Sequence, residues 1–256
     1  MRGFFSALSF LTVIPFPESL KAGEKRMFAG YPAAGLVIGC ILSLLFLAAG
    51  RLFPESLAAV TLVAGSLLLT GAIHLDGLAD CADAFYGRRD RQETMRILKD
   101  PRIGTMGGAA IGISLLARYA AVVSLPGAVV LLALPILSAL SRTTILVALR
   151  VLPYVRSKGG IISAGSSSSP GLIVLACLVI AAVAVLLPVP TIVALLCVAA
   201  FWRLSWKRIG GCTGDVLGAT IEIAEIAFLA TLAALDHLGV AFGLFFPLAA
   251  PILAGR

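Results

Sequence analysis

The sequence has few charged residues and very few histidines. Asp, Glu, Lys and Arg make up 13% of its 256 residues, and histidine occurs twice, whereas a soluble domain is about a quarter charged. Hydrophobic residues reach 60%, and the mean hydropathy is +1.05. Since the apolar runs are continuous rather than alternating, they indicate helices rather than a barrel. We predict an all-α fold, a polytopic integral membrane helical bundle, and the composition argues against a soluble protein.

Paired cysteines are also lacking. The five cysteines are scattered, with no C-x-x-C pair, and several lie in apolar runs where cysteine behaves as a small hydrophobic residue. This pattern excludes a disulfide framework and a cysteine-based zinc site. The positions are Cys40, Cys81, Cys177, Cys197 and Cys212.

Apolar stretches of near-spanning length follow one another, and they predict about six to eight transmembrane helices in a single domain, residues 1–256. The segment 3–16 is too short to span and contains Pro15, with Pro17 directly after it, so we expect an interfacial or re-entrant segment, with a signal peptide as the alternative. The longer stretches lie at about 29–50, 56–73, 106–124, 128–149, 171–187, 191–202, 214–235 and 240–255.

Lysine and arginine are concentrated in every second connector. The connectors 17–28, 74–105, 150–169 and 203–213 hold 15 of the 20, and the alternate connectors hold only Arg51. The positive-inside rule therefore predicts a multi-pass protein of the cell inner (cytoplasmic) membrane, with these connectors and the active site facing the cytoplasm. Topology also explains the net charge of +7, so nucleic acid is not an expected partner. The lipid bilayer is an expected partner, and a homo-oligomer is compatible with the sequence.

The stretch HLDGLADCADAF opens a segment at 74–105 that we expect to be amphipathic and cytoplasmic. A helix places Asp76, Asp80 and Asp83 on one face. Three like charges repel one another there, and Mg²⁺ relieves this conflict because it takes carboxylate oxygens together with substrate phosphates. We predict that all three are catalytic and bind Mg²⁺, with a solvated helix face as the alternative. His74 lies on the other side of the helix and is expected to form hydrogen bonds or contact substrate.

Three further regions supply candidate substrate-binding residues. Lys99, Asp100 and Arg102 precede a glycine-rich helix start and predict a phosphate cradle. Arg142 lies inside an apolar run, where a charge either faces the protein interior or snorkels to the interface.

Near the end of the chain, Asp215 begins a span that also carries Glu222 and Glu225. Intramembrane glutamates indicate function or pairing with Arg142 or Arg118. Because Asp215 and the aspartates of 74–85 are both expected at cytoplasmic mouths, we hypothesise that Asp215 joins their site.

Six blocks together resemble the cobalamin synthase family, the adenosylcobinamide-GDP ribazoletransferases. In chain order they are FLTVIPFP, HLDGLADCADAFYG, ILKDPRIGTMGG, LSR, PYVR and GGCTGDVLGATIEIAE. The sequence departs from the family pattern at Val13, Ala84 and Met106, none of which is an aspartate.

The resemblance implies a Mg²⁺-dependent transfer of adenosylcobinamide phosphate from adenosylcobinamide-GDP to α-ribazole or α-ribazole 5′-phosphate. The products are adenosylcobalamin or its 5′-phosphate, and GMP, in a late step of cobalamin biosynthesis. It implies that Asp76 and Asp80 bind Mg²⁺, that Asp83 is a ligand or base, and that Arg102 and Arg142 contact phosphate. The alternatives are another membrane diphosphate-dependent transferase, of the CDP-alcohol phosphotransferase or prenyltransferase type, and then a secondary transporter.

Overall fold

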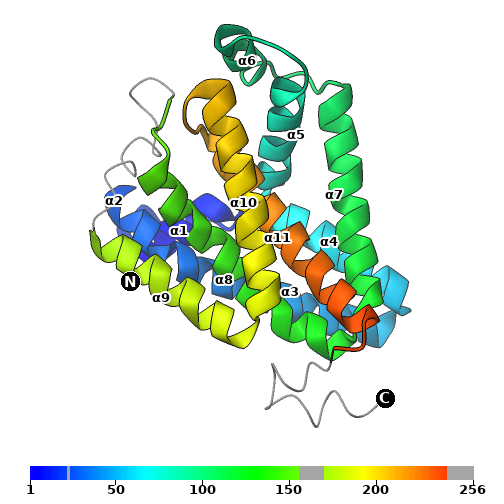
Figure 1. Cartoon of the computed structure of the whole chain (residues 1–256). Helices are drawn as coiled ribbons and strands as arrows, with labels where there is room; N and C mark the ends of the chain where they lie inside the picture. Colours follow the sequence, from blue (N-terminus) through cyan, green and yellow to red (C-terminus); the bar gives the residue numbers. More distant parts are fainter. Residues whose placement is uncertain (22–23, 156–169, 241–256) are drawn as a thin grey trace.

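The computed structural model describes residues 1–21, 24–155 and 170–240, and in those ranges the chain is built from helices (Figure 1). Within them, the sole β-type pairing is one bridge between Tyr154 and Cys212. Short helical turns lie at Glu18–Leu20, Glu24–Met27 (α2) and Phe28–Gly30. The longer helices are α1 (Arg2–Leu11), α3 (Tyr31–Leu52), α4 (Glu55–Thr70), α5 (Ile73–Phe85), α6 (Arg91–Ile97), α7 (Thr105–Ser124), α8 (Gly127–Val151), α9 (Pro170–Leu186), α10 (Pro188–Ile209) and α11 (Gly214–His237).

The predicted helical membrane bundle is confirmed, and the described ranges reach the lower end of the predicted number of spans. Five helices there are long and apolar enough to cross a bilayer, and six spans result if the bent pair α4–α5 is counted as one. The apolar helix α9 has 17 residues, slightly fewer than a span needs. The predicted stretch 240–255 lies, apart from Val240, outside the described residues.

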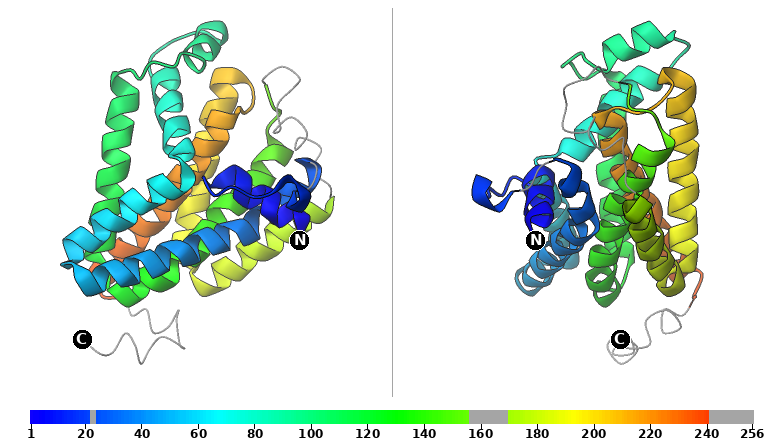
Figure 2. Two further views of the ribbon diagram at one scale, coloured as in Figure 1. Left: turned by 180° about the vertical axis from the view of Figure 1, so that it is seen from behind. Right: turned by 90° about the vertical axis from the view of Figure 1, so that its left-hand side faces the viewer.

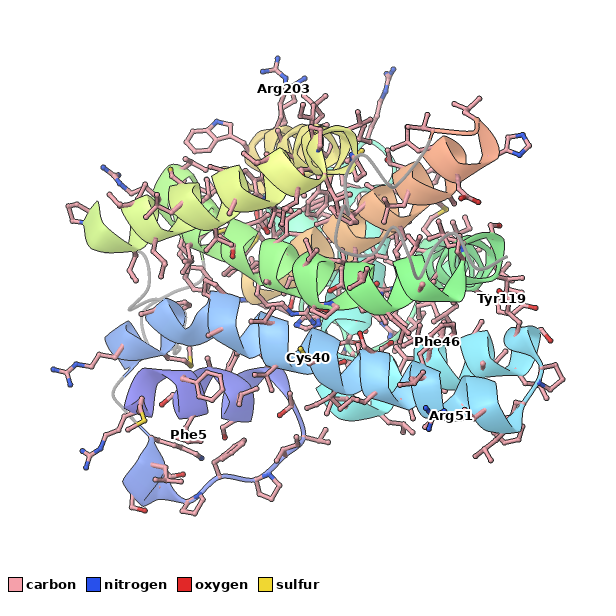
Figure 3. The ribbon with its side chains drawn as sticks, turned by 90° about the horizontal axis from the view of Figure 1, so that it is seen from below. Phe5, Cys40, Phe46, Arg51, Tyr119 and Arg203 are labelled. Atoms are coloured by element: carbon pink, nitrogen blue, oxygen red, sulfur yellow. The ribbon has the colours of Figure 1, made fainter. Side chains whose placement is uncertain are left out.

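Large apolar side chains cover the outside of the bundle as well as its core. Leu44, Ile113 and Leu178 are each more than 60% exposed, which is the surface that lipid requires rather than one suited to water. Viewed from below, the Arg203 side chain projects from the outer edge of the bundle (Figure 3). The apolar face is therefore a lipid-facing surface of a membrane protein.

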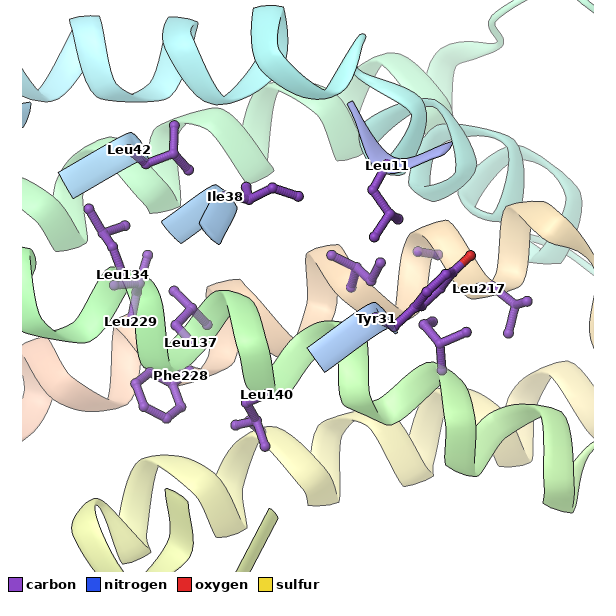
Figure 4. Packing of buried hydrophobic residues seen from close by; sticks show 14 of the residues in the cluster. Leu11, Tyr31, Ile38, Leu42, Leu134, Leu137, Leu140, Leu217, Phe228 and Leu229 are labelled. Carbon is purple, nitrogen blue, oxygen red and sulfur yellow. The ribbon is translucent and has the colours of Figure 1, made fainter. Parts of the chain in front are cut away.

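Glycines bring α3 and α8 into backbone contact at the centre of the bundle. Gly35 and Gly39 are one helical turn apart, and a methyl group on Gly39 would lie 2.5 Å from the Cα atom of Pro135. Small residues at this spacing allow membrane helices to approach closely. Leu137 and Leu140 of α8 belong to the buried core around this contact (Figure 4).

The first part of the segment 74–105, which was predicted to be amphipathic and cytoplasmic, packs into the bundle. α4 and α5 meet at an angle of 89°, at Gly71 and Ala72, whose φ angles are +62° and +56°. Beyond the bend, α5 packs against α7 and α11 inside the bundle. The reason is that its glycine, alanine and cysteine residues form a packing surface for other helices. Only α6 and its flanking turns remain on the surface, at one end of the molecule (Figures 1 and 2).

The first helix, α1, has 10 residues and is too short to cross a bilayer by itself. Its Leu8 and Leu11 side chains belong to the buried core. After α1 the chain becomes extended, and the Val13 amide donates to the Leu69 carbonyl oxygen at 2.9 Å. This contact holds the N-terminal segment beside the end of α4, close to the bend.

Candidate active site

Helices α5 and α11 carry the predicted site residues and touch at two glycines. A methyl group on Gly77 would lie 2.6 Å from the Asp215 carbonyl oxygen, and one on Gly218 would lie 3.3 Å from the Cα atom of His74. Each helix thus has a glycine where the other carries a polar residue. At the start of α11, the Thr213 hydroxyl donates to the Asp215 carboxylate at 3.1 Å.

A cavity of about 310 Å³ lies beside this contact, with walls from α1, α3, α5, α8 and α11. Asp76 and Asp215, far apart in the sequence, both line it, and His74 lines it as well. His74 and Asp76 point to different sides of an ideal helix, yet they share the cavity because it surrounds the first turn of α5. The other lining residues are Phe10, Leu11, Tyr31, Ile73, Ile145, Gly214, Leu217, Gly218 and Ile221.

The three aspartates of α5 have different surroundings. Asp76 is exposed at the cavity, and Asp80, one turn later, is half-buried. Asp83 accepts hydrogen bonds from the backbone amides of Gly104 at 2.7 Å and Gly107 at 2.8 Å. Seven helical residues rise about 10 Å, so Asp76 and Asp83 lie about two turns apart along α5.

The contact of Asp83 changes the interpretation of the glycine-rich start of α7. The sequence predicted a phosphate cradle there, but in the structure the amides of Gly104 and Gly107 are occupied by the Asp83 carboxylate. The first amides of a helix lack partners within the helix, and a negative charge at this end is stabilising. Asp83 therefore joins the end of α5 to the start of α7.

The donor chemistry of the cavity fits Mg²⁺, although a complete cage of ligands is not gathered. In the described part of the chain, no three His, Cys, Asp or Glu side chains lie close enough to hold a metal ion. Asp76 and Asp215 nevertheless place two carboxylates on one cavity, with Asp80 a turn from Asp76. Mg²⁺ takes one or two carboxylates, substrate phosphates and several waters, so three preassembled carboxylates are not required.

Lys99, Asp100 and Arg102 lie on the loop between α6 and α7. Arg102 binds the Asp100 carboxylate through its Nε atom at 2.9 Å and a terminal nitrogen at 2.7 Å. This hydrogen bonding lowers the pKa of Asp100 to about 2. Lys99 and Arg102 are exposed, so both can reach an anion in solution, but Arg102 would first have to leave Asp100. Arg156, from the PYVR block, lies outside the described residues.

Four charged side chains from α7, α8 and α11 form a buried network. Arg118 binds Glu222 at 2.7 Å and Glu225 at 2.8 Å, and Arg142 also pairs with Glu225. Two positive and two negative charges thereby compensate one another, as intramembrane charges must. Arg142 was predicted to contact phosphate. In the structure it is bound to Glu225 and does not line the cavity, so its guanidinium holds helices together.

The sequence did not identify the apolar part of the cavity as a ligand site. Phe10 and Leu11 begin the FLTVIPFP block, but only the fold brings them and Tyr31 to α5 and α11. Gly218 carries a clearer local signal, since a glycine one turn into an apolar helix can mark a close approach of another backbone.

The chain is similar to known proteins over most of its length. Residues 3–233 match the family described as cobalamin-5-phosphate synthase. A protein of Pseudomonas savastanoi pv. phaseolicola, called adenosylcobinamide-GDP ribazoletransferase, is 38% identical over 92% of this chain and 100% of its own. Proteins of the same name from Chlorobaculum parvum and Escherichia coli are 37% and 34% identical, over 89% and 90% of this chain and 93% and 98% of theirs. No solved structure matches. The chain therefore belongs to the cobalamin-5-phosphate synthase family.

Proposed function

We propose that this membrane protein transfers adenosylcobinamide phosphate from adenosylcobinamide-GDP to α-ribazole or α-ribazole 5′-phosphate, in a late step of cobalamin biosynthesis. The observation that carries the proposal beyond family membership is the shared cavity of Asp76 and Asp215. These two carboxylates come from the two most distinctive sequence blocks, and they meet at the ends of α5 and α11. A diphosphate substrate needs such groups because positioning and charge neutralisation dominate phosphoryl transfer.

In the reaction, a ribose hydroxyl oxygen of the acceptor forms a bond to the phosphorus attached to cobinamide. The bond from that phosphorus to the bridging oxygen breaks, and GMP leaves. The hydroxyl proton must pass to a base, and we assign this role to a carboxylate oxygen of Asp76, which faces the cavity. Asp83 is less suited, because both of its carboxylate oxygens already accept backbone hydrogen bonds.

We propose that Asp76, Asp80 and Asp215 would hold Mg²⁺. When bound, the ion would neutralise charge on the diphosphate and on the departing GMP. Arg102 and Lys99 would then contact the guanosine phosphate from the exposed loop, with Arg102 exchanging Asp100 for the substrate.

We further propose that the cavity faces the cytoplasm in the cell inner membrane. Support comes from the distribution of basic residues, since Lys207 and Arg208 in the last turn of α10 lie at the same end of the molecule as α6 with its Arg91 and Arg96 (Figure 1). A cysteine placed in the exposed loop at Lys99 should react with an impermeant maleimide only after spheroplasts are opened. Labelling of intact spheroplasts would show that the protein has the opposite orientation in the membrane.

The test of function is a coupling assay on the protein in lipid nanodiscs. It contains adenosylcobinamide-GDP and α-ribazole, with and without Mg²⁺, and GMP and adenosylcobalamin are measured by chromatography. We expect equal amounts of both products, lost with EDTA, and a decrease in kcat of about 100-fold or more for Asp76→Asn.

Asp90→Asn is the matched control, because Asp90 caps α6 through its side chain and asparagine caps equally well. It should retain normal turnover. Absence of product from folded wild-type protein with either acceptor would reject the proposed function. Near-normal turnover of Asp76→Asn would reject the role of this carboxylate.

A further inference from the structure

The cavity combines mostly apolar walls with a few polar groups. Its walls are largely apolar, and Leu11, Tyr31 and Leu217 lie near one another there (Figure 4). The polar groups are the Tyr31 hydroxyl at the start of α3 and the side chains of His74, Asp76 and Asp215 from α5 and the start of α11. Few polar groups on a mostly apolar concave wall are typical of a site for a small organic molecule.

His74 is the polar group on the buried side of this cavity. Its side chain is 5% exposed, and its Nε2 atom has no hydrogen-bond partner among the residues that the structure describes. The backbone on either side of it is fixed by the contact with Gly218. A buried polar atom without a partner costs about 1–3 kcal/mol, so a ligand that supplies the missing hydrogen bond would be favoured.

A second buried atom is also without a partner. The Nε atom of Arg142 makes no hydrogen bond within the described ranges, while a terminal nitrogen of the same guanidinium pairs with Glu225. Of these two unpartnered atoms, only His74 Nε2 belongs to a residue that lines the cavity.

The shape and charge of the cavity limit what it can hold. Its volume of about 310 Å³ is at the lower end of the range for small-molecule sites, enough for a two-ring base with a ribose but too small for a corrin macrocycle. The carboxylates of Asp76 and Asp215 oppose a phosphate group unless a cation is present. A lipid chain would suit the apolar walls but would leave His74 without a hydrogen bond.

We propose that this cavity is the acceptor subsite, in which the apolar walls hold the uncharged aromatic base of α-ribazole and His74 hydrogen-bonds to a ribose hydroxyl. This inference rests on the proposed function. A hydroxyl can donate or accept, so it serves either tautomer of a neutral imidazole. The ribose then lies beside Asp76, where the reacting hydroxyl loses its proton, and the donor's corrin ring remains outside the cavity.

The first test fills the apolar wall. Ile145 lines the cavity and is 2% exposed, so Ile145→Phe would occupy ligand space. We expect Ile145→Phe to raise the KM for α-ribazole about tenfold or more, with the KM for adenosylcobinamide-GDP within about twofold of wild type. The matched control is the same change on the lipid-facing surface, Ile113→Phe, which should change neither value by more than about threefold because Ile113 is 68% exposed and does not line the cavity.

The second test changes the hydrogen bond and decides the question if Ile145→Phe fails to fold. His74→Gln places an amide near the position of Nε2, whereas His74→Leu removes all hydrogen bonding. We expect His74→Leu to raise the α-ribazole KM about tenfold and His74→Gln to restore most of that loss. Equilibrium dialysis of α-ribazole, without Mg²⁺ or donor, should show the same order of affinities.

The possible failures are distinguishable. If wild-type protein yields no product, the proposed function is rejected. If wild-type protein turns over but the α-ribazole KM is unchanged in Ile145→Phe and His74→Leu, the acceptor binds elsewhere, and a lipid chain is the better occupant of the cavity. A rise confined to the KM for adenosylcobinamide-GDP would assign the cavity to the donor and also overturn the inference.

Discussion

Asp83 is expected to stabilise the start of α7 rather than to bind metal. Asp83→Ala would leave the amides of Gly104 and Gly107 without their acceptor. Asp83→Asn would keep one carbonyl acceptor and remove the charge. Both changes act on the junction between α5 and α7, so they should loosen the loop that carries Lys99 and Arg102 before they affect the cavity.

The magnitude follows from the two hydrogen bonds, which are 2.7 and 2.8 Å long. Replacing a helix-capping side chain by alanine costs about 0.5–2 kcal/mol, and a negative charge at a helix N-terminus contributes about 0.3–1 kcal/mol. Each carboxylate oxygen of Asp83 accepts one of these two hydrogen bonds. We therefore expect a loss of about 2–3 kcal/mol in the free energy of unfolding for Asp83→Ala and about 1 kcal/mol for Asp83→Asn.

Two measurements distinguish a helix-capping role of Asp83 from a role as a metal ligand. Hydrogen exchange in nanodiscs should become faster at residues 104–108 in both variants, and the Mg²⁺ concentration for half-maximal turnover should stay within about twofold of wild type. Asp76→Asn should show the reverse, with unchanged exchange in α7 and impaired turnover. An Asp83→Asn protein with normal exchange and a tenfold higher Mg²⁺ requirement would refute the capping role and make Asp83 a metal ligand.

Three further predictions concern stability and protonation. Arg118→Met would leave two glutamates buried without their shared partner and should cost about 3–5 kcal/mol. Thermal unfolding in detergent measures this, and an unchanged midpoint would contradict the buried network. Ala72→Gly should stabilise the protein by about 1 kcal/mol, because alanine at φ +56° is strained and glycine is not. A lower unfolding midpoint would show that the strain is absent. The pKa of Asp100 is about 2, below its ordinary value of 3.8, so its stabilising contact is fully present above pH 3.8 and is lost as the pH falls through 2. A carboxyl ¹³C titration should show that midpoint moving back toward 3.8 in Arg102→Ala, and an unmoved midpoint would exclude this ion pair as the cause.

The fold class could be predicted from composition, but the position of α5 could not. Continuous apolar runs and alternating basic connectors are direct consequences of crossing a bilayer. The residues around Gly77 and Ala79 are small, and in membranes small residues can mark the place where another helix packs. Sequence alone shows neither which helix packs there nor that the chain bends at Gly71 and Ala72 to bring α5 into the bundle.

In the candidate site, too, features set by neighbouring residues could be predicted from the sequence, whereas contacts between distant segments could not. The spacing of Asp76 and Asp80 is local, so the sequence could place them one turn apart on a helix. The partners of Asp83 are more than twenty residues away, and nothing in its neighbourhood marks it as a cap. Tyr31 reaches the cavity only through the packing of α3 against the rest of the bundle.

Backbone contact, rather than loop structure, sets the distance between the two parts of the site. A methyl group on Gly77 would lie 2.6 Å from the Asp215 carbonyl oxygen, so Gly77→Ala must push α5 away from α11 and displace Asp76 from Asp215. A shift of about 1 Å can cost about 100-fold in rate without removing any functional group. We expect kcat to fall by that order while the protein stays folded. Gly112→Ala is the control, since a methyl group there meets nothing within 4 Å and alanine favours a helix. If the two variants kept equal activity, the α5–α11 contact would not determine the geometry of the site.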